Sequence, residues 1–384
     1  MTKEDLLSGF LYLVMAGVII LVGFLAIRPA FSNELNFLKD GMTILFLVVA
    51  LIIGVVLNVI LFALGHALGA KLGGYTILLN NLLGFCFYKY KKEDGKISTK
   101  FGFKSFNGLT GDMIIAPKKE NSNPMFYVFM PLIFILLEIA AYIAVASMLT
   151  SKSGNTLFLI KYGLMVVATV GGCMGIYNYF PAKLDSVNDG YRLVLLRKKV
   201  NIEAYNVRLG IEAREYFNEA YEEPKVFEEI TDFTAQVNNE TAMYKFSNGE
   251  TESALEILDK LFADEKKISK NTLRDIKINK AFIYFLTKDL ESAKELINSF
   301  DEETNTFITN CKSLGAIRTY ILYIGLIEKS KSEIEFALGR IKKFKEKVSS
   351  GTYIKEKEFI KKATDYVNEN SELLKEFDYE IYFK

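Results

Sequence analysis

The sequence of 384 residues contains one histidine, three cysteines and no tryptophan. A single histidine excludes metal sites that need several imidazole ligands. Cys86, Cys173 and Cys311 lie far apart and match no C-x-x-C pattern, which predicts free thiols in a reducing compartment rather than a disulfide framework. Without tryptophan, tyrosines such as Tyr12 and Tyr162 are left to occupy any membrane interface.

Charged residues are scarce in the first half of the chain. The long uncharged runs lie before residue 182, and Lys and Glu dominate after it. The formal net charge of +1 therefore averages a membrane half and a soluble half. No Lys/Arg block is interleaved with aromatic residues, so we predict no nucleic-acid partner. Lys outnumbers Arg, which is typical of low-GC bacteria.

Four apolar segments are long enough to cross a bilayer, which takes about 20 helical residues. They cover residues 8–27, 42–70, 124–149 and 156–180. Lys and Arg gather in the loop 71–123 and directly after the fourth segment, whereas the other two connections carry few of them. The positive-inside rule therefore predicts a multi-pass cell-membrane protein whose loop 71–123 and both termini are cytoplasmic.

One acidic and one basic residue, Glu138 and Lys161, are the only Asp, Glu, Lys or Arg within these segments. Glu138 is near the middle of the third, where a carboxyl group is costly unless it is paired or faces a wet cavity. Two interpretations stay open: a cavity or proton-relay residue, or a protonated carboxyl bonded to a neighbouring helix. Lys161 lies near the outer end of the fourth segment, from which its side chain reaches the interface.

The stretch "FCFYKYKKEDGKISTKFGF", residues 85–103, predicts a cytoplasmic β-hairpin. Asp94-Gly95 is a strong two-residue turn signal, and aromatic residues fill both arms. A second β-like piece covers residues 108–117. We consider two roles: an exposed edge that accepts an extended peptide by strand addition, or an amphipathic hairpin that lies on anionic lipid.

The only histidine stands in "LFALGHALGAKLGG", Leu61–Gly74. Two histidines at i and i+4 of a helix chelate zinc, and a glutamate after the first acts as general base, which gives the motif H-E-x-x-H. Here Phe62 and Ala63 occupy the places of the first histidine and the glutamate, and only His66 remains. Taken alone, one histidine in an apolar helix predicts a structural role.

Two stretches resemble motifs of the site-2 protease family of intramembrane zinc metalloproteases. "ALGHALGAKLGGY" resembles the family's active-site helix, and "NYFPAKLDSVNDGYRL", Asn178–Leu193, resembles its second motif, Asn-x-x-Pro followed by Asp-Gly. The resemblance covers residues 42–195 and implies that the second to fourth segments form a three-helix core. It implies His66 and Asp189 as zinc ligands that face one another, Asn178 and Pro181 as substrate-binding residues, and Asp185 as an alternative ligand that lacks a following glycine.

The departure from the family concerns the chemistry itself. Catalytic zinc normally has three protein ligands, and this sequence offers two and no general base. We expect zinc to be absent or weakly bound, and the protein to be an inactive protease relative that binds a membrane-spanning or extended peptide in its core cleft. Two alternatives remain: an active protease whose His and Glu were substituted in this sequence, or a membrane-anchored helical-repeat scaffold.

The last part of the chain is charged and periodic. "NGETESALEILDKLF" and "TKDLESAKELINSF" are similar, with Ala254 and Ala293 at corresponding positions, and residues 331–344 form a weaker third unit. This pattern predicts an all-α domain similar to tetratricopeptide repeats, which offers a concave surface to a protein partner. The alternative is a bundle that packs only on itself. The expected domains are 1–41 (first helix and loop), 42–199 (membrane core) and 200–384 (cytosolic repeats).

Overall fold

The computed structural model describes residues 3–31, 41–103, 112–119, 121–149, 155–182, 187–220, 222–345, 347–375 and 377–383. The chain divides into two compact units. One comprises residues 1–88 and 101–202, and the other comprises residues 89–100 and 203–384. The division at residue 202 lies close to the place where the sequence changes from apolar to charged.

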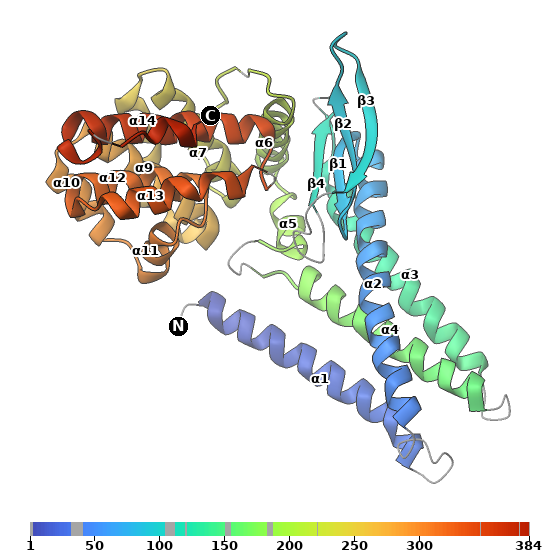
Figure 1. Ribbon diagram of the computed structural model, residues 1–384. Helices are drawn as coiled ribbons and strands as arrows, with labels where there is room; N and C mark the ends of the chain where they lie inside the picture. Colours follow the sequence, from blue (N-terminus) through green and yellow to red (C-terminus); the bar gives the residue numbers. More distant parts are fainter. Residues whose placement is uncertain are drawn as a thin grey trace. The chain divides into compact units, whose positions relative to one another are not determined.

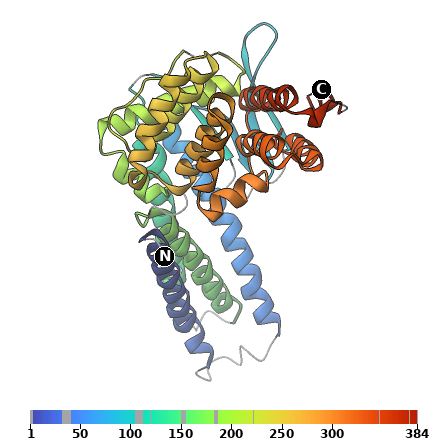
Figure 2. The ribbon, with the colours of Figure 1, turned by 90° about the vertical axis from the view of Figure 1, so that its left-hand side faces the viewer.

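Helices and a small sheet make up the first unit (Figure 1). Its elements are α1 (Lys3–Phe31), α2 (Gly41–Leu72), β1 (Tyr75–Leu82), β2 (Phe85–Lys91), β3 (Ile97–Phe103), β4 (Asp112–Pro117), α3 (Pro124–Met148), α4 (Asn155–Tyr179) and α5 (Asp189–Leu195). Helices α2, α3 and α4 pack against one another, and α1 packs along α4 (Figure 2).

Three helical segments are long and apolar enough to cross a membrane: Leu45–Leu72, Pro124–Met148 and Ile160–Tyr179. They coincide with the second, third and fourth predicted spans. The first predicted span is helical as part of α1, but its apolar stretch among the described residues, Gly9–Leu21, is shorter than the roughly 20 residues that a bilayer requires. The coarser expectation of a helical protein with several apolar spans holds, and the first span, which would bring the number to four, stays a prediction.

Glycines at every fourth position bring the end of α2 against the start of α3. A Cβ atom added at Gly65 would lie 2.5 Å from Pro131 Cα, and one at Gly69 would lie 2.3 Å from the Phe126 carbonyl oxygen. Any side chain would therefore push the helices apart. Small residues at this spacing allow close helix contact in membranes, where apolar surface alone gives no driving force. The contact fixes the helix segment that carries His66.

The strands form one sheet in the order β3-β2-β1-β4. β1 pairs antiparallel with both β2 and β4. The predicted hairpin of residues 85–103 corresponds to β2 and β3, and Gly95 in its turn has a φ of +80°, which glycine adopts without strain. Of the predicted strand at 108–117, residues 112–117 form β4, and residues 108–111 lie outside the described part of the chain.

The second unit is helical apart from the end of the hairpin. Its helices are α6 (Lys199–Tyr216, which begins in the first unit), α7 (Asp232–Ser247), α8 (Thr251–Ala263), α9 (Lys270–Thr287), α10 (Leu290–Asn298), α11 (Glu302–Thr309), α12 (Leu314–Tyr323), α13 (Lys331–Gly339) and α14 (Ser350–Asn370). A π-helical turn follows α12 at Ile324–Glu328, and short 3₁₀ turns cover Glu265–Lys267, Ile341–Phe344, Glu372–Leu374 and Tyr379–Tyr382.

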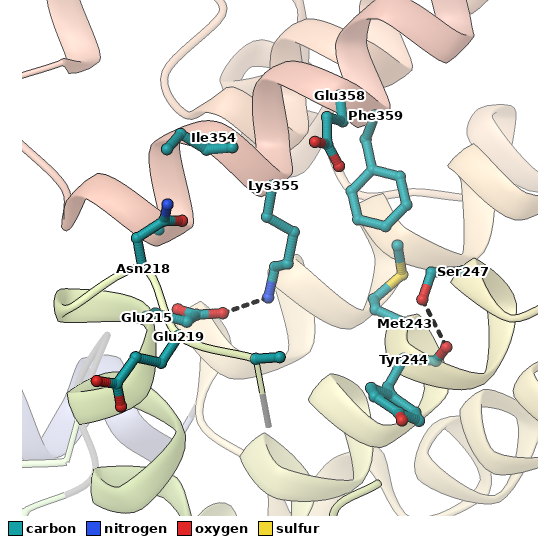
Figure 3. Close-up of a pocket in the computed structure, with 12 residues that line it drawn as sticks. Glu215, Asn218, Glu219, Met243, Tyr244, Ser247, Ile354, Lys355, Glu358 and Phe359 are labelled. Atoms are coloured by element: carbon teal, nitrogen blue, oxygen red, sulfur yellow. Dashed lines mark hydrogen bonds and ion pairs between the residues drawn. The ribbon is translucent and has the colours of Figure 1, made fainter. Parts of the chain in front are cut away.

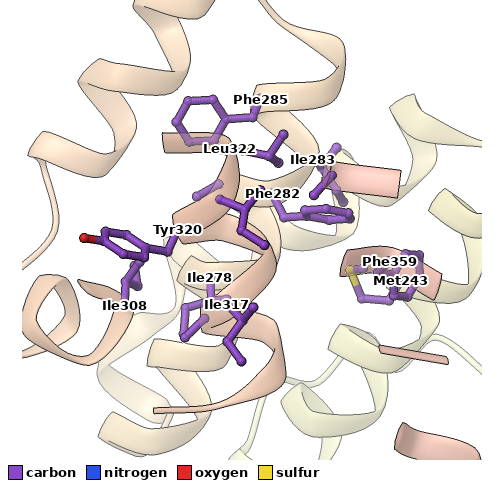
Figure 4. Close-up of a cluster of buried hydrophobic side chains, with 14 of the residues drawn as sticks. Met243, Ile278, Phe282, Ile283, Phe285, Ile308, Ile317, Tyr320, Leu322 and Phe359 are labelled. Atoms are coloured by element: carbon purple, nitrogen blue, oxygen red, sulfur yellow. The ribbon is translucent and has the colours of Figure 1, made fainter. Parts of the chain in front are cut away.

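Neighbouring helices in this unit pack as pairs around one apolar core (Figure 4), with α7 against α8 and α9 against α10. Ala254 and Ala293, the matching alanines of the two similar stretches, are both fully buried. The all-α character of this region is as expected. Its likeness to tetratricopeptide repeats stays a prediction, because paired helices occur in many helical folds.

Candidate functional site

His66 of α2 and Asp189 of α5 meet inside the first unit, as expected. The Nε2 atom of His66 lies 3.5 Å from Oδ2 of Asp189, and their side chains are 12% and 8% exposed. The other ring nitrogen, Nδ1, lies 3.0 Å from the carbonyl oxygen of Tyr127. Because a carbonyl only accepts, Nδ1 carries the hydrogen and Nε2 faces the carboxylate. Metal-binding histidines commonly have this orientation, with the second nitrogen donating to a carbonyl.

The side chain of Asn188 joins the end of α4 to the start of α5. Its Oδ1 accepts hydrogen bonds from the backbone N–H groups of Tyr191 (3.0 Å) and Ala182 (3.3 Å). Its Nδ2 donates to the carbonyl groups of Tyr177 (3.0 Å) and Phe180 (2.7 Å). One amide thus caps α5 and satisfies carbonyls at the end of α4, where helices leave such groups unpaired.

Steric constraint explains why a glycine follows Asp189 in the second motif. A Cβ atom at Gly190 would lie 2.1 Å from the carbonyl oxygen of Tyr179, so only glycine fits where α5 begins against α4. Asp189 is thereby held beside the end of α4. Its other oxygen, Oδ1, lies 3.2 Å from Nη1 of Arg192, one turn further along α5.

Aromatic rings surround the imidazole of His66. The ring centroid of Phe62 lies 4.7 Å from that of His66 at an interplanar angle of 83°, and the Tyr127 centroid lies 4.6 Å away. Phe62 also contacts the ring of Tyr179. Phe62 and Ala63 are both buried, at 6% and 7% exposure. The two positions that differ from H-E-x-x-H therefore belong to a closed apolar wall beside the histidine.

The residues present do not fit a catalytic zinc ion. Two donors that share a tetrahedral zinc lie roughly 3.3 Å apart, so the His66–Asp189 pair has a suitable spacing by itself. Phe62 has no lone pair to complete the set, and in the part of the chain that the structure describes no three His, Cys, Asp or Glu residues gather closely enough to hold a metal. The guanidinium of Arg192 adds a positive charge beside the carboxylate of Asp189.

No family model, curated protein or solved structure matches this chain. The resemblance to site-2 proteases consequently depends on the two sequence motifs, and it remains a hypothesis.

The structure describes both residues that the resemblance implied as substrate-binding, and that role stays a prediction. Asn178 donates from Nδ2 to the carbonyl of Met174 at 2.9 Å, a hydrogen bond within α4. Pro181 is exposed just beyond the end of α4. Asp185, the alternative ligand, lies outside the described residues.

Two polar residues, Asn58 and Glu138, are buried within the apolar helices α2 and α3. Asn58, fully buried in α2, donates to the carbonyls of Gly54 (2.9 Å) and Val167 (3.3 Å) and so links α2 to α4. Sequence reasoning missed it, although it is the one amide in a long uncharged run. Glu138 is buried in α3, and neither carboxyl oxygen makes a hydrogen bond of normal geometry, although Tyr142 stands one turn away.

The second unit contains a cavity of about 360 Å³ between the end of α6, α7 and α14 (Figure 3). Met243 and Phe359 give it an apolar side, and Glu219 and Glu358 add carboxylates at its wall. Figure 3 shows Lys355 reaching Glu215, and their Nζ–Oε1 distance is 2.6 Å. The cavity combines apolar contact with net negative charge.

Beside this cavity lies a buried cation. Arg318 of α12 is 1% exposed, and its Nη1 lies 2.9 and 3.1 Å from the two carboxylate oxygens of Glu356. Its guanidinium also contacts Asn279 and lies between two rings, 4.5 Å from the centroid of Phe282 and 5.0 Å from that of Phe359. The charge is therefore paired and stacked, as burial of a guanidinium requires.

Proposed function

We propose that this chain is a multi-pass membrane protein, related in design to site-2 proteases, that binds a membrane-spanning or extended peptide and does not cleave it. The apolar helices support the membrane part of this proposal. Large side chains such as Leu13 (73% exposed), Ile20 (70%) and Leu137 (64%) point outwards from α1 and α3. Apolar surface on this scale is unfavourable in water and favourable in lipid.

The surroundings of His66 are the main support for the proposed loss of activity. A histidine and an aspartate 3.5 Å apart keep the spacing of a shared metal, while the places of the third ligand and the base are occupied by the buried Phe62 and Ala63. Loss of a general base alone typically costs 10²–10⁴ in rate. On this proposal, the site keeps the spacing of two zinc ligands and lacks the third ligand and the base that hydrolysis requires.

Two alternative functions lead to different expectations. An active protease whose residues were substituted in this sequence requires His and Glu codons at positions 62 and 63 of the natural gene. A membrane-anchored scaffold that resembles the family by chance requires no proximity between the motifs, so the 3.5 Å distance counts against it.

The helical unit is proposed to bind a protein partner. Its cavity suits a basic side chain, whose stem would lie on Met243 and Phe359 while its charge approaches Glu358. Within the same unit, Glu219 at the cavity wall already pairs with the Lys91 ammonium at 2.8 Å, which illustrates this preference.

Metal content of the purified full-length protein in detergent tests the proposed dead site. The unmodified protein should hold little or no zinc. The double change Phe62→His and Ala63→Glu should restore about one zinc per chain, because two histidines at i and i+4 and Asp189 again supply three ligands. Ala63→Glu alone should bind no more zinc than the unmodified protein.

Two control variants make this test specific. Leu64→His adds an imidazole to the same helix at a half-exposed position outside the site, and it should not raise zinc binding. Adding Asp189→Asn to the double change should remove the restored zinc. One tightly bound zinc in the unmodified protein would refute the dead site, and a zinc-free double variant would refute the proposed relation to the family.

A further inference from the structure

The hairpin formed by β2 and β3 presents apolar side chains to the outside. Successive side chains of a strand point to opposite faces. Phe85 and Phe87 of β2 are 53% and 55% exposed, whereas Cys86 between them is fully buried. On β3, Phe101 and Phe103 are 47% and 75% exposed. The outer face therefore carries the four largest apolar residues of these strands, which reverses the usual pattern of a half-buried sheet.

These four phenylalanines form one continuous patch, which we call the aromatic face. Ring centroids lie 5.3 Å apart for Phe85 and Phe103, 5.0 Å for Phe87 and Phe101, and 5.5 Å for Phe101 and Phe103. A cluster of this kind on the outside of a folded protein indicates a binding surface rather than scattered exposure.

Backbone hydrogen bonds tie the sheet to the ends of two membrane helices. β1 begins three residues after α2 ends, and β4 ends seven residues before α3 begins. The N–H of Asn123 donates to the carbonyl of Gly73 at 2.8 Å, and the N–H of Lys118 donates to that of Gly74 at 3.0 Å. The sheet is thereby held at the level where α2 ends and α3 begins.

The register directs the aromatic face back along α2. Phe85 pairs with Leu82, at the end of β1 that is far from the Gly73-Gly74 turn, and β1 packs against α2 (Figure 1). Further along β2, the next position of the same face is Lys89. A change from phenylalanine to lysine along one strand matches the change from acyl chains to anionic headgroups across the membrane interface.

We propose that the aromatic face is inserted into the lipid bilayer beside α2, with its phenylalanines among the acyl chains. Lipid is the occupant that the observations favour, because the patch is fixed to membrane helices and its four exposed side chains are entirely apolar. This inference depends on the membrane part of the proposed function and not on the fate of the zinc site.

The absence of tryptophan from the chain permits a direct test, since one introduced tryptophan is the only one present. The full-length Phe101→Trp protein is placed in nanodiscs whose lipids are brominated on the acyl chains, and quenching is compared with that in unbrominated nanodiscs. We expect strong quenching, several times that of Tyr88→Trp, which places the ring on the opposite face of the same strand pair. Phe87→Trp repeats the measurement if Phe101→Trp does not fold.

A reference on α2 separates the possible failures. Ile52→Trp lies on the outside of α2, where Ile52 is 58% exposed, and it should be quenched in any protein that spans the bilayer through α2. Quenching of Ile52→Trp without quenching of the aromatic-face variants would overturn the insertion and assign the face to water or to a protein partner. If Ile52→Trp is also unquenched, the membrane assignment itself is wrong.

Discussion

Phe62 affects the site through its shape as well as through its lack of a ligand atom. Its ring meets His66 edge-on and also contacts Tyr179 of α4, so it joins two helices at the point where a metal would otherwise do so. An aromatic pair of this geometry contributes about 0.5–1.5 kcal/mol beyond its burial. Replacing Phe62 with histidine therefore removes packing that the new metal must compensate.

Arg318 gives the clearest prediction for a single residue of the helical unit. We expect Arg318→Ala to lower the free energy of unfolding by about 3–5 kcal/mol, because it leaves Glu356 without its partner and opens a space between two rings. Thermal or chemical unfolding of the full-length protein in detergent measures this change.

A paired substitution provides the control for Arg318. Replacing Arg318 with Met and Glu356 with Leu together should recover most of the loss, because apolar residues of similar volume often substitute well for a buried ion pair. A change of less than about 0.5 kcal/mol for Arg318→Ala, as is usual at surface positions, would show that the guanidinium is hydrated rather than buried.

Sequence reasoning found some site residues and missed others for a physical reason. His66 and Asp189 belong to local motifs, and they were predicted to meet. Asn58 and Asn188 act through hydrogen bonds to backbone groups of other segments, which depend on how the helices pack and leave no fixed spacing in the sequence. Asn188 did have one local signal, since asparagine directly before an Asp-Gly pair is a favourable helix N-cap.

At the scale of elements, the glycine spacing of α2 gives a testable expectation. Gly69→Ala places a methyl group against the backbone of Phe126 and should cost about 1–3 kcal/mol as an overpacking change. Gly172→Ala is the matched control, because among the described residues no atom beyond its chain neighbours and the adjacent backbone of its own helix lies within 4 Å of the position of its added Cβ. The midpoint of thermal unfolding in detergent should fall for Gly69→Ala and stay unchanged or rise for Gly172→Ala. Equal midpoints would contradict the close α2–α3 contact.

Elements with a local sequence signal were predictable, whereas the way they pair and stack with other elements was not. The β2–β3 hairpin followed from Asp94-Gly95 and the flanking aromatic residues, and three of the apolar segments coincide with long helices. The pairing of β1 with β4 had no such signal, because the β2–β3 hairpin separates the two strands in the sequence. The predicted repeat pattern of the tail gave helices and buried alanines, without fixing how the pairs stack.

For the whole molecule, the predicted topology places residues 71–123 and 182–384 in the cytoplasm. Cysteines introduced as Lys96→Cys and Glu250→Cys, both at exposed positions, should escape an impermeant thiol reagent in intact cells. Ser153→Cys, in a connection predicted to lie outside, should react and serves as the positive control. Background should be low because Cys86 and Cys311 are buried and the half-buried Cys173 lies within α4, inside a predicted span. Labelling at residue 96 or 250 would reverse the orientation.

The four hydrogen bonds of Asn188 have a mechanical consequence for the whole core. They connect the last turn of α4 to the first turn of α5. Because Gly190 has no side chain, α5 also packs directly against the backbone of Tyr179, so the two helices are expected to move together. A tilt of α4 would consequently move Asp189 relative to His66, whose position on α2 is fixed by the close glycine contacts with α3. A peptide that wedges between α2 and α4 would be sensed as a change in the distance between two side chains that it need not touch.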